Sequence, residues 1–186
     1  MTKPDDNDLD FTNLASTPEP APAKLENARL EAISGNQELQ QSGFYVAMGR
    51  RSSTRVPPKD GSEKHTLLVV EDDKTLCKLL AEILITAGYS ARFASNRAQI
   101  NAEVNRATLP DLMLLDVQLP DADGLKVLAK LRSHPKFAEL PVIMMTGRSG
   151  AADVMQGLAA GADGYVTKPF KMSALVGVVN AALGKT

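Results

Sequence analysis

The chain has 186 residues, with 21 lysines and arginines against 22 aspartates and glutamates, which leaves a formal net charge of -1 at pH 7. A net charge this close to zero gives no overall attraction to nucleic acid or to a membrane surface, so neither is an expected partner. The single cysteine, Cys77, excludes an internal disulfide and suits a reducing compartment. The polar start, with Lys3 and Asp5, has no apolar run of the kind that a signal peptide or a membrane span needs. We therefore expect a cytoplasmic protein.

The first 64 residues differ in composition from the rest of the chain. They contain the run Pro18-Glu19-Pro20-Ala21-Pro22 and the pair Pro57-Pro58, with few apolar residues between them. Such a stretch cannot bury enough apolar surface to offset the entropy lost on ordering. We expect residues 1–64 to form a disordered or weakly structured N-terminal arm, with no packing before about residue 60, and residues 65–186 to form one folded domain.

From Thr66 onward, short apolar runs alternate with helical patterns, and the connections between them are short. The runs predict strands at about 66–71, 90–94, 111–116, 141–146 and 163–167. The patterns between them predict helices at about 74–87, 97–106, 123–133, 151–160 and 171–184, with Asp73 as the N-cap of the first. This alternation is typical of an α/β domain in which helices flank a parallel sheet.

Polar residues follow four of these apolar runs at the point where each predicted strand ends. Asp116 ends the run Leu112-Met113-Leu114-Leu115, and Glu71-Asp72-Asp73 follows the first strand. Thr146 and Lys168 follow the fourth and fifth strands. Because the carboxyl ends of parallel strands meet at one edge of an open sheet, we expect these side chains to lie together there.

The residue types at this edge indicate phosphoryl chemistry. Carboxylates that gather at one place repel each other unless a cation neutralises them, and oxygen ligands without histidine or cysteine suit Mg²⁺. We expect Asp72 and Asp116 to be ligands of this metal. Lys168 supplies a positive charge and Thr146 a hydroxyl for phosphate oxygens. The set predicts phosphoryl transfer to or from Asp116, with the carboxylate as the nucleophile.

These motifs resemble the receiver domain of two-component response regulators, the chemotaxis-regulator-like fold. The resemblance covers about residues 65–186. It is carried by Leu68-Val69-Val70-Glu71-Asp72-Asp73, by Asp116 with Pro120 and Asp123-Gly124, by Thr146-Gly147, and by Gly161-Ala162-Asp163-Gly164-Tyr165 leading to Lys168-Pro169-Phe170. It implies a doubly wound, five-stranded parallel sheet of flavodoxin-like order 2-1-3-4-5, with helices on both faces.

The resemblance also implies a metal site and a phosphoacceptor. Asp116 would accept a phosphoryl group from a histidine kinase or a phosphotransfer protein. Asp72 would bind Mg²⁺ directly together with Asp116, Glu71 would act through a bound water, and the backbone carbonyl of Gln118 would complete the protein ligands. Glu71 stands where many members of the family have Asp.

A second group of roles implied by the resemblance concerns the phosphoryl oxygens and the switch. Thr146 and Lys168 would contact the phosphoryl oxygens, and the Lys168-Pro169 bond would be cis. Tyr165 matches the switch aromatic of the family, so Thr146 and Tyr165 would link the chemistry to the output.

We therefore expect a phosphorylation-dependent signalling switch, which catalyses at most its own phosphorylation and dephosphorylation. No recognisable output domain follows the last predicted helix, so we expect a stand-alone receiver that acts on an unknown downstream protein partner. The main alternative is a Mg²⁺-dependent, aspartate-nucleophile phosphatase of the haloacid-dehalogenase type. That class has a second Asp two residues after the nucleophile, and this chain has Gln118 there.

Two further classes remain as rivals. A flavodoxin-like cofactor binder needs a phosphate-cradling first loop, whereas Glu71-Asp72-Asp73 would repel a phosphate. A DNA-binding regulator needs a helix-turn-helix or an ordered basic reading element, and the sequence shows neither.

Overall fold

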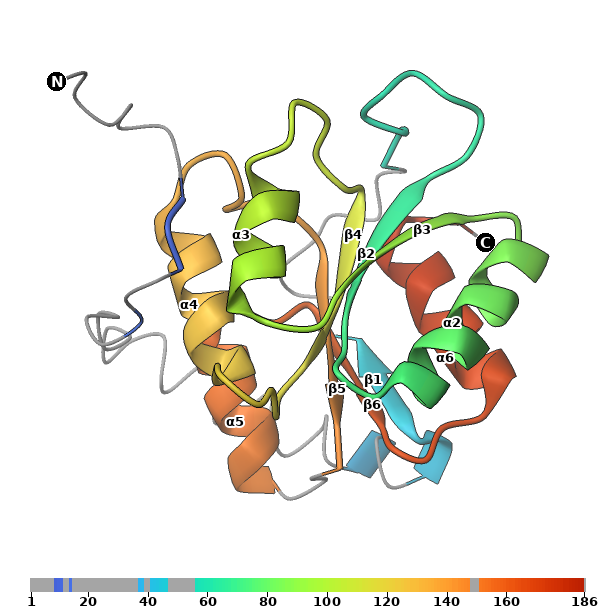
Figure 1. Cartoon of the computed structure of the whole chain (residues 1–186). Coiled ribbons are helices and arrows are strands. Elements are labelled where there is room, and N and C mark those ends of the chain that lie inside the picture. Colours follow the sequence, from blue (N-terminus) through green and yellow to red (C-terminus); the bar gives the residue numbers. More distant parts are fainter. Residues whose placement is uncertain are drawn as a thin grey trace, which may run out of the picture.

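A six-stranded sheet forms the centre of the computed structural model, with helices on both of its faces (Figure 1). The structure describes residues 9–11, 14, 37–38, 41–46, 56–147 and 151–185. The strands are β1 (Phe44–Val46), β2 (Thr66–Val70), β3 (Ser90–Ala94), β4 (Leu112–Asp116), β5 (Val142–Thr146) and β6 (Gly164–Thr167). The helices are α2 (Lys74–Thr86), α3 (Arg97–Val104), α4 (Gly124–Ser133), α5 (Ala151–Ala160) and α6 (Met172–Ala182).

The five predicted parallel strands are all present, and their order confirms the predicted fold. The sheet runs β1-β6-β5-β4-β2-β3, so the five strands from β2 onward have the order 2-1-3-4-5. Each of their pairings is parallel. Helices α2 and α6 cover one face of the sheet, and α3, α4 and α5 cover the other (Figure 1). The carboxyl ends of the strands therefore meet at one edge, as the sequence predicts.

Aspartate side chains mark the ends of three elements, and at two of these ends the boundary differs from the predicted one by one residue. Asp73 accepts hydrogen bonds from the amides of Thr75 and Leu76, so it is the predicted N-cap of α2. Asp123 lies outside α4 because its carboxylate caps the helix. Asp111 lies before β4, where its carboxylate accepts the amides of Lys59 and Thr66, each at 2.7 Å. Short acidic side chains bind nearby backbone groups and so mark the ends of elements.

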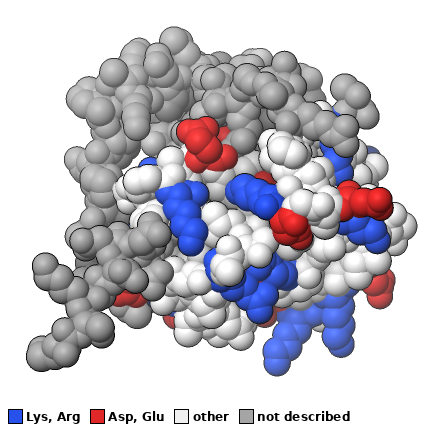
Figure 2. Space-filling model, turned by 90° about the horizontal axis from the view of Figure 1, so that it is seen from above, with Lys and Arg blue, Asp and Glu red and all other residues white. Residues whose placement is uncertain are grey.

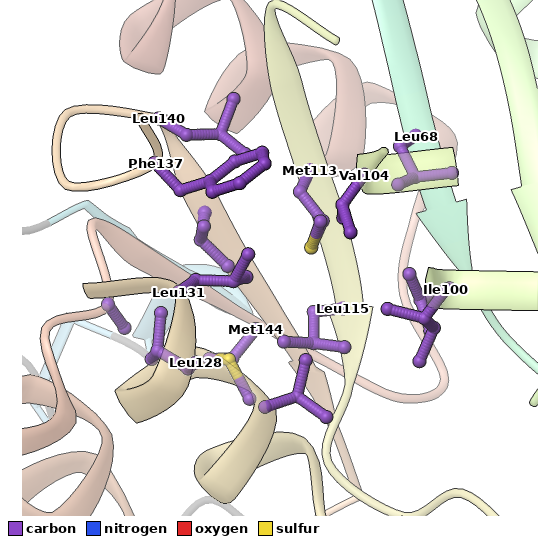
Figure 3. Packing of buried hydrophobic residues seen from close by; sticks show 14 of the residues in the cluster. Leu68, Ile100, Val104, Met113, Leu115, Leu128, Leu131, Phe137, Leu140 and Met144 are labelled. Carbon is purple, nitrogen blue, oxygen red and sulfur yellow. The ribbon is translucent and has the colours of Figure 1, made fainter. Parts of the chain in front are cut away.

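The interior consists of two apolar layers, one on each face of the sheet. All five residues of β4 and all five of β5 are buried, because helices cover both faces of these central strands. On one face, side chains of the strands pack against α3 and α4, as Figure 3 shows for Leu115, Met144, Ile100 and Leu131. On the other face, a separate cluster packs against α2 and α6.

Charged side chains of both signs share the surface. Lys and Arg side chains lie at several places on the face seen from above, with Asp and Glu side chains beside them (Figure 2). Glu103 illustrates the pairing, because it lies 3.4 Å from both Arg92 and Arg106. Among the residues that the structure describes, no helix is long and apolar enough to cross a membrane.

Parts of the N-terminal arm pack on the domain, which corrects the prediction of no packing before about residue 60. Leu9, Phe11 and Leu14 are buried, and Phe11 has no exposed surface. The amide of Phe11 donates to the Asn101 side chain at 3.2 Å, and the Asn105 side-chain amide donates to the Leu9 carbonyl at 3.2 Å. Three apolar residues scattered in a polar stretch have no period that would reveal this contact.

The arm also supplies the sixth strand, which the sequence did not predict. β1 pairs antiparallel with β6, so the predicted five-stranded sheet has an additional strand at one edge. Most of the expected disordered arm lies outside the described residues, and the division of the chain at residue 64 stays a prediction.

Replacing Phe11 tests the packing of the arm. Phe11→Ala removes a fully buried ring, and a rigid core would lose about 3–5 kcal/mol from such a change. Because a short docked segment can detach, we expect a smaller loss, about 1–3 kcal/mol, in the free energy of unfolding measured by urea denaturation. Phe11→Leu, the matched control, should retain most of the stability. A Phe11→Ala protein as stable as wild type would show that packing of this segment on the domain does not stabilise the protein.

Candidate functional site

The predicted polar side chains meet at the carboxyl edge of the sheet. Asp116 and Thr146 are the last residues of β4 and β5. Glu71 and Lys168 follow directly on β2 and β6. Carboxylate oxygens of Glu71, Asp72 and Asp116 all lie within 4.8 Å of one another. The structure therefore brings together the residues that the sequence analysis singled out.

Lys168 lies between two of these carboxylates and binds both. Its Nζ atom donates to Oε2 of Glu71 at 2.6 Å and to Oδ2 of Asp116 at 2.8 Å. Glu71 and Asp116 are 1% and 6% exposed, whereas Asp72 is exposed. Buried carboxylates are costly unless they are paired, and one ammonium group here serves two of them. The peptide bond between Lys168 and Pro169 is cis, as the resemblance implies.

Backbone contacts fix the position of the Asp116 carboxylate. The amide of Gln118 donates to Oδ1 of Asp116 at 3.2 Å, so the two carboxylate oxygens have different partners. The start of α4 packs directly on the backbone of Asp116: a Cβ atom at Gly124 would lie 2.1 Å from the Asp116 carbonyl oxygen. Only a glycine fits this approach.

Burial and charge shift the pKa values of two groups in the site. Burial is the largest effect on Glu71 and raises the pKa of its carboxyl group, and the nearby Asp116 charge adds to this. The pKa of Lys168 is also raised: burial lowers it, but hydrogen bonds to Asp116 and Glu71 outweigh that effect. A positive Lys168 beside crowded carboxylates leaves an excess of negative charge that a cation would relieve.

The donor set fits a hard divalent cation. The three carboxylates offer oxygen atoms only, and Asp72 offers an exposed one, so solvent molecules have access to complete a coordination shell. Mg²⁺ binds proteins through one or two carboxylates and keeps several waters, which matches this partly open arrangement. The acidic cluster is therefore typical of a magnesium site.

Thr146 and Tyr165 lie on neighbouring strands beside the site. Thr146 is 3% exposed, and Tyr165 is 1% exposed. The Tyr165 hydroxyl donates to the carbonyl oxygen of Val154 in α5 at 3.0 Å, so the ring lies beneath this helix. A Cβ atom at Gly157 would lie 1.6 Å from the Tyr165 hydroxyl oxygen, which makes this glycine the residue that leaves room for the ring. Nothing in the sequence marks Gly157, because only the packed structure shows which helical glycine faces the tyrosine.

Comparison with known proteins identifies relatives of this chain. The family model for the response regulator receiver domain matches residues 67–180. The phosphate regulon transcriptional regulatory protein PhoB of Pseudomonas aeruginosa is 36% identical over 121 residues, which are 65% of this chain and 52% of PhoB. The probable transcriptional regulatory protein TcrX of Mycobacterium tuberculosis is 39% identical over 65% of this chain and 50% of its own length. The chain thus spans about half the length of these curated relatives.

A solved structure gives the same result for the fold. The receiver domain of a sensor histidine kinase from Pseudomonas aeruginosa, with a magnesium ion coordinated in its active-site cleft, matches with a TM-score of 0.58. The match covers 66% of this chain and 99% of that one, at 24% identity.

The raised pKa of Glu71 predicts a pH-dependent stability difference. An acid whose pKa is higher in the folded state contributes stability below its unfolded pKa and loses that contribution as the pH rises through the folded pKa. Glu71→Gln should therefore match wild type at acidic pH and become the more stable protein as the pH rises. Each unit of raised pKa corresponds to about 1.4 kcal/mol.

The measurement is urea unfolding of metal-free protein across this pH range. The control is Glu63→Gln, at an exposed glutamate before β2, which should show no such trend. Added Mg²⁺ should stabilise wild type more than Glu71→Gln, because the metal relieves the carboxylate repulsion. A Glu71→Gln protein less stable than wild type at neutral pH would contradict this account.

Proposed function

The chain belongs to the response regulator receiver domain family, and on this basis we propose that Asp116 is its phosphoacceptor. The domain is a phosphorylation switch of two-component systems and not a conventional enzyme. The phosphoryl donor is a histidine kinase or a phosphotransfer protein: the phosphorus–nitrogen bond of a phosphohistidine breaks while a bond from phosphorus to a carboxylate oxygen of Asp116 forms. The observation that carries the proposal is the Lys168 ammonium, 2.8 Å from Oδ2 of Asp116.

Mg²⁺ is the proposed cofactor. Asp72 and Asp116 bind it directly, the Gln118 backbone carbonyl completes the protein ligands, and Glu71 acts through a water molecule. Support comes from the three carboxylates within 4.8 Å of one another and from the magnesium ion in the solved receiver structure of the same fold. When bound, the metal supplies positive charge beside the phosphoryl oxygens.

Lys168 and Thr146 are the proposed contacts of the phosphoryl group. Lys168 already touches Asp116, and its charge stabilises oxygens that become negative during transfer. The Thr146 hydroxyl supplies a neutral donor from the adjacent strand. A phosphoryl group adds strong acceptor oxygens, so it draws this hydroxyl toward Asp116. The movement of Thr146 leaves space beside β6 and favours an inward position of Tyr165, in which the ring is buried beneath α5. In the structure the Tyr165 ring is buried and its hydroxyl is hydrogen-bonded to Val154, so Tyr165 is in the inward position.

The output of the switch is a changed affinity for a protein partner. PhoB and TcrX are described as transcriptional regulatory proteins, but the chain covers only about half of each. DNA binding therefore does not carry over to the described domain. The phosphatase alternative lacks support, because Gln118 occupies the position of its second Asp and contributes a backbone amide to Asp116.

Asp116→Asn tests the phosphoacceptor directly. Acetyl phosphate with Mg²⁺ should add one phosphoryl group to wild type, as measured by intact-mass spectrometry, and none to this variant, because an amide oxygen is a poor nucleophile. Asp72→Ala should need more Mg²⁺ for the same extent of phosphorylation.

The control for these variants is Asp73→Asn. Asn caps a helix as well as Asp does, so the protein should keep α2 and still form the adduct. An undiminished adduct on Asp116→Asn would exclude Asp116 as the acceptor.

A further inference from the structure

The edge of β6 carries a strand from a distant part of the chain. In β1, Phe44 lies opposite Val166, Tyr45 opposite Tyr165, and Val46 opposite Gly164. Just before β1, the Gly43 carbonyl oxygen accepts the Thr167 amide at 3.0 Å and the Thr167 hydroxyl at 3.1 Å. Helix α6 also contacts β1. Thr167, the residue before Lys168, is thus hydrogen-bonded to the residue that precedes β1.

The register places a second tyrosine beside the proposed switch residue. Residues directly opposite each other in an antiparallel pair project to the same face of the sheet. Tyr45 and Tyr165 are 8% and 1% exposed, and both belong to the apolar cluster on the α3, α4 and α5 face. The closeness of Tyr45 also helps to raise the pKa of Tyr165, whose burial is the larger cause.

This arrangement restricts the movement of Tyr165. β5 lies on one side of β6 and β1 on the other, so a ring that leaves its place beneath α5 on the side away from β5 turns toward β1. Tyr45 lies along that route. The docked strand therefore favours the inward position of Tyr165 over an outward one.

We propose that the edge of β6 that faces away from β5 is a binding site for an extended strand, that residues 43–46 of this chain occupy it, and that their docking holds Tyr165 inward. This rests on the proposed role of Asp116 and Tyr165. Since phosphorylation favours the same inward position, docking of β1 and phosphorylation of Asp116 strengthen each other by equal factors. The arm is then a positioning element of the switch.

Two glycines with positive φ provide a matched pair of variants. Gly43 has φ +79°, and an added Cβ would meet only the Thr167 hydroxyl oxygen at 3.7 Å. Gly61 has φ +70°, and an added Cβ would meet nothing within 4 Å. Gly43→Ala and Gly61→Ala thus introduce the same backbone strain, but only Gly43→Ala introduces it at β1. Tyr45→Ala removes the ring and leaves the backbone of β1.

The experiment uses the full chain and beryllofluoride as a phosphoryl mimic. The chain has 3 tyrosines, so fluorotyrosine labelling gives three ¹⁹F signals, which single Tyr→Phe variants assign. In wild type, saturating beryllofluoride should slow hydrogen exchange of the residue 44–46 amides by about 5-fold or more. Gly43→Ala and Tyr45→Ala should shift the Tyr165 signal toward a second environment. Both should raise the beryllofluoride concentration at half-saturation by a similar factor, whereas Gly61→Ala should not.

Two results would overturn the proposal. The first leaves the proposed function of Asp116 intact, and the second overturns that function as well. If beryllofluoride binds and moves the Tyr165 signal while exchange at residues 44–46 is unchanged or faster, β1 is not coupled to the switch, although Asp116 keeps its proposed role. If wild type shows no bound beryllofluoride signal at all, the proposed function fails and this inference fails with it.

Discussion

The ion pairs of Lys168 with Glu71 and Asp116 are the interaction on which the site depends. Two carboxylates that are almost fully buried share one ammonium group at 2.6 and 2.8 Å. Without the Lys168 ammonium both buried carboxylates would lack a counter-charge, so the three side chains must be placed together. They stand at the ends of β2, β4 and β6, which are far apart along the chain. In the sheet β4 lies beside β2, and only β5 separates it from β6, so the strand order brings the three side chains to one point.

Contacts at the amino ends of β5 and β6 fix the register between these two strands, and this register places Lys168 beside Asp116. Asp163 lies just before β6, and its carboxylate accepts the amide of Val142 at 2.8 Å, so the two strands begin level with each other. Arg132 of α4 donates to the same carboxylate at 2.8 Å and to the Gly161 carbonyl oxygen at 2.8 Å. A slip of one residue in β6 would turn Tyr165 to the other face of the sheet and move Lys168 away from Asp116.

The sequence predicted the parallel core and the site residues because both follow from local patterns. Apolar runs marked the strands, and the rule that parallel strands end at one edge placed Glu71, Asp116 and Lys168 together. Other features depend on contacts between distant residues. Gly157 does not stand out in the sequence, because its role depends on the contact with Tyr165. Phe11 does not stand out either, because its burial depends on α3 and α4. β1 has only three residues, and its pairing needs the edge of β6 to exist first.

The central claim is that the buried aspartate at the end of β4, paired with Lys168, is the group that carries the phosphoryl signal. Borohydride reduces an aspartyl phosphate to homoserine, which marks the acceptor without any mutation. Wild-type protein phosphorylated by acetyl phosphate, then reduced, digested and sequenced by mass spectrometry, should carry homoserine at position 116 and aspartate at position 72. Homoserine at another position, or none at 116 in protein whose intact mass shows the adduct, would contradict the account.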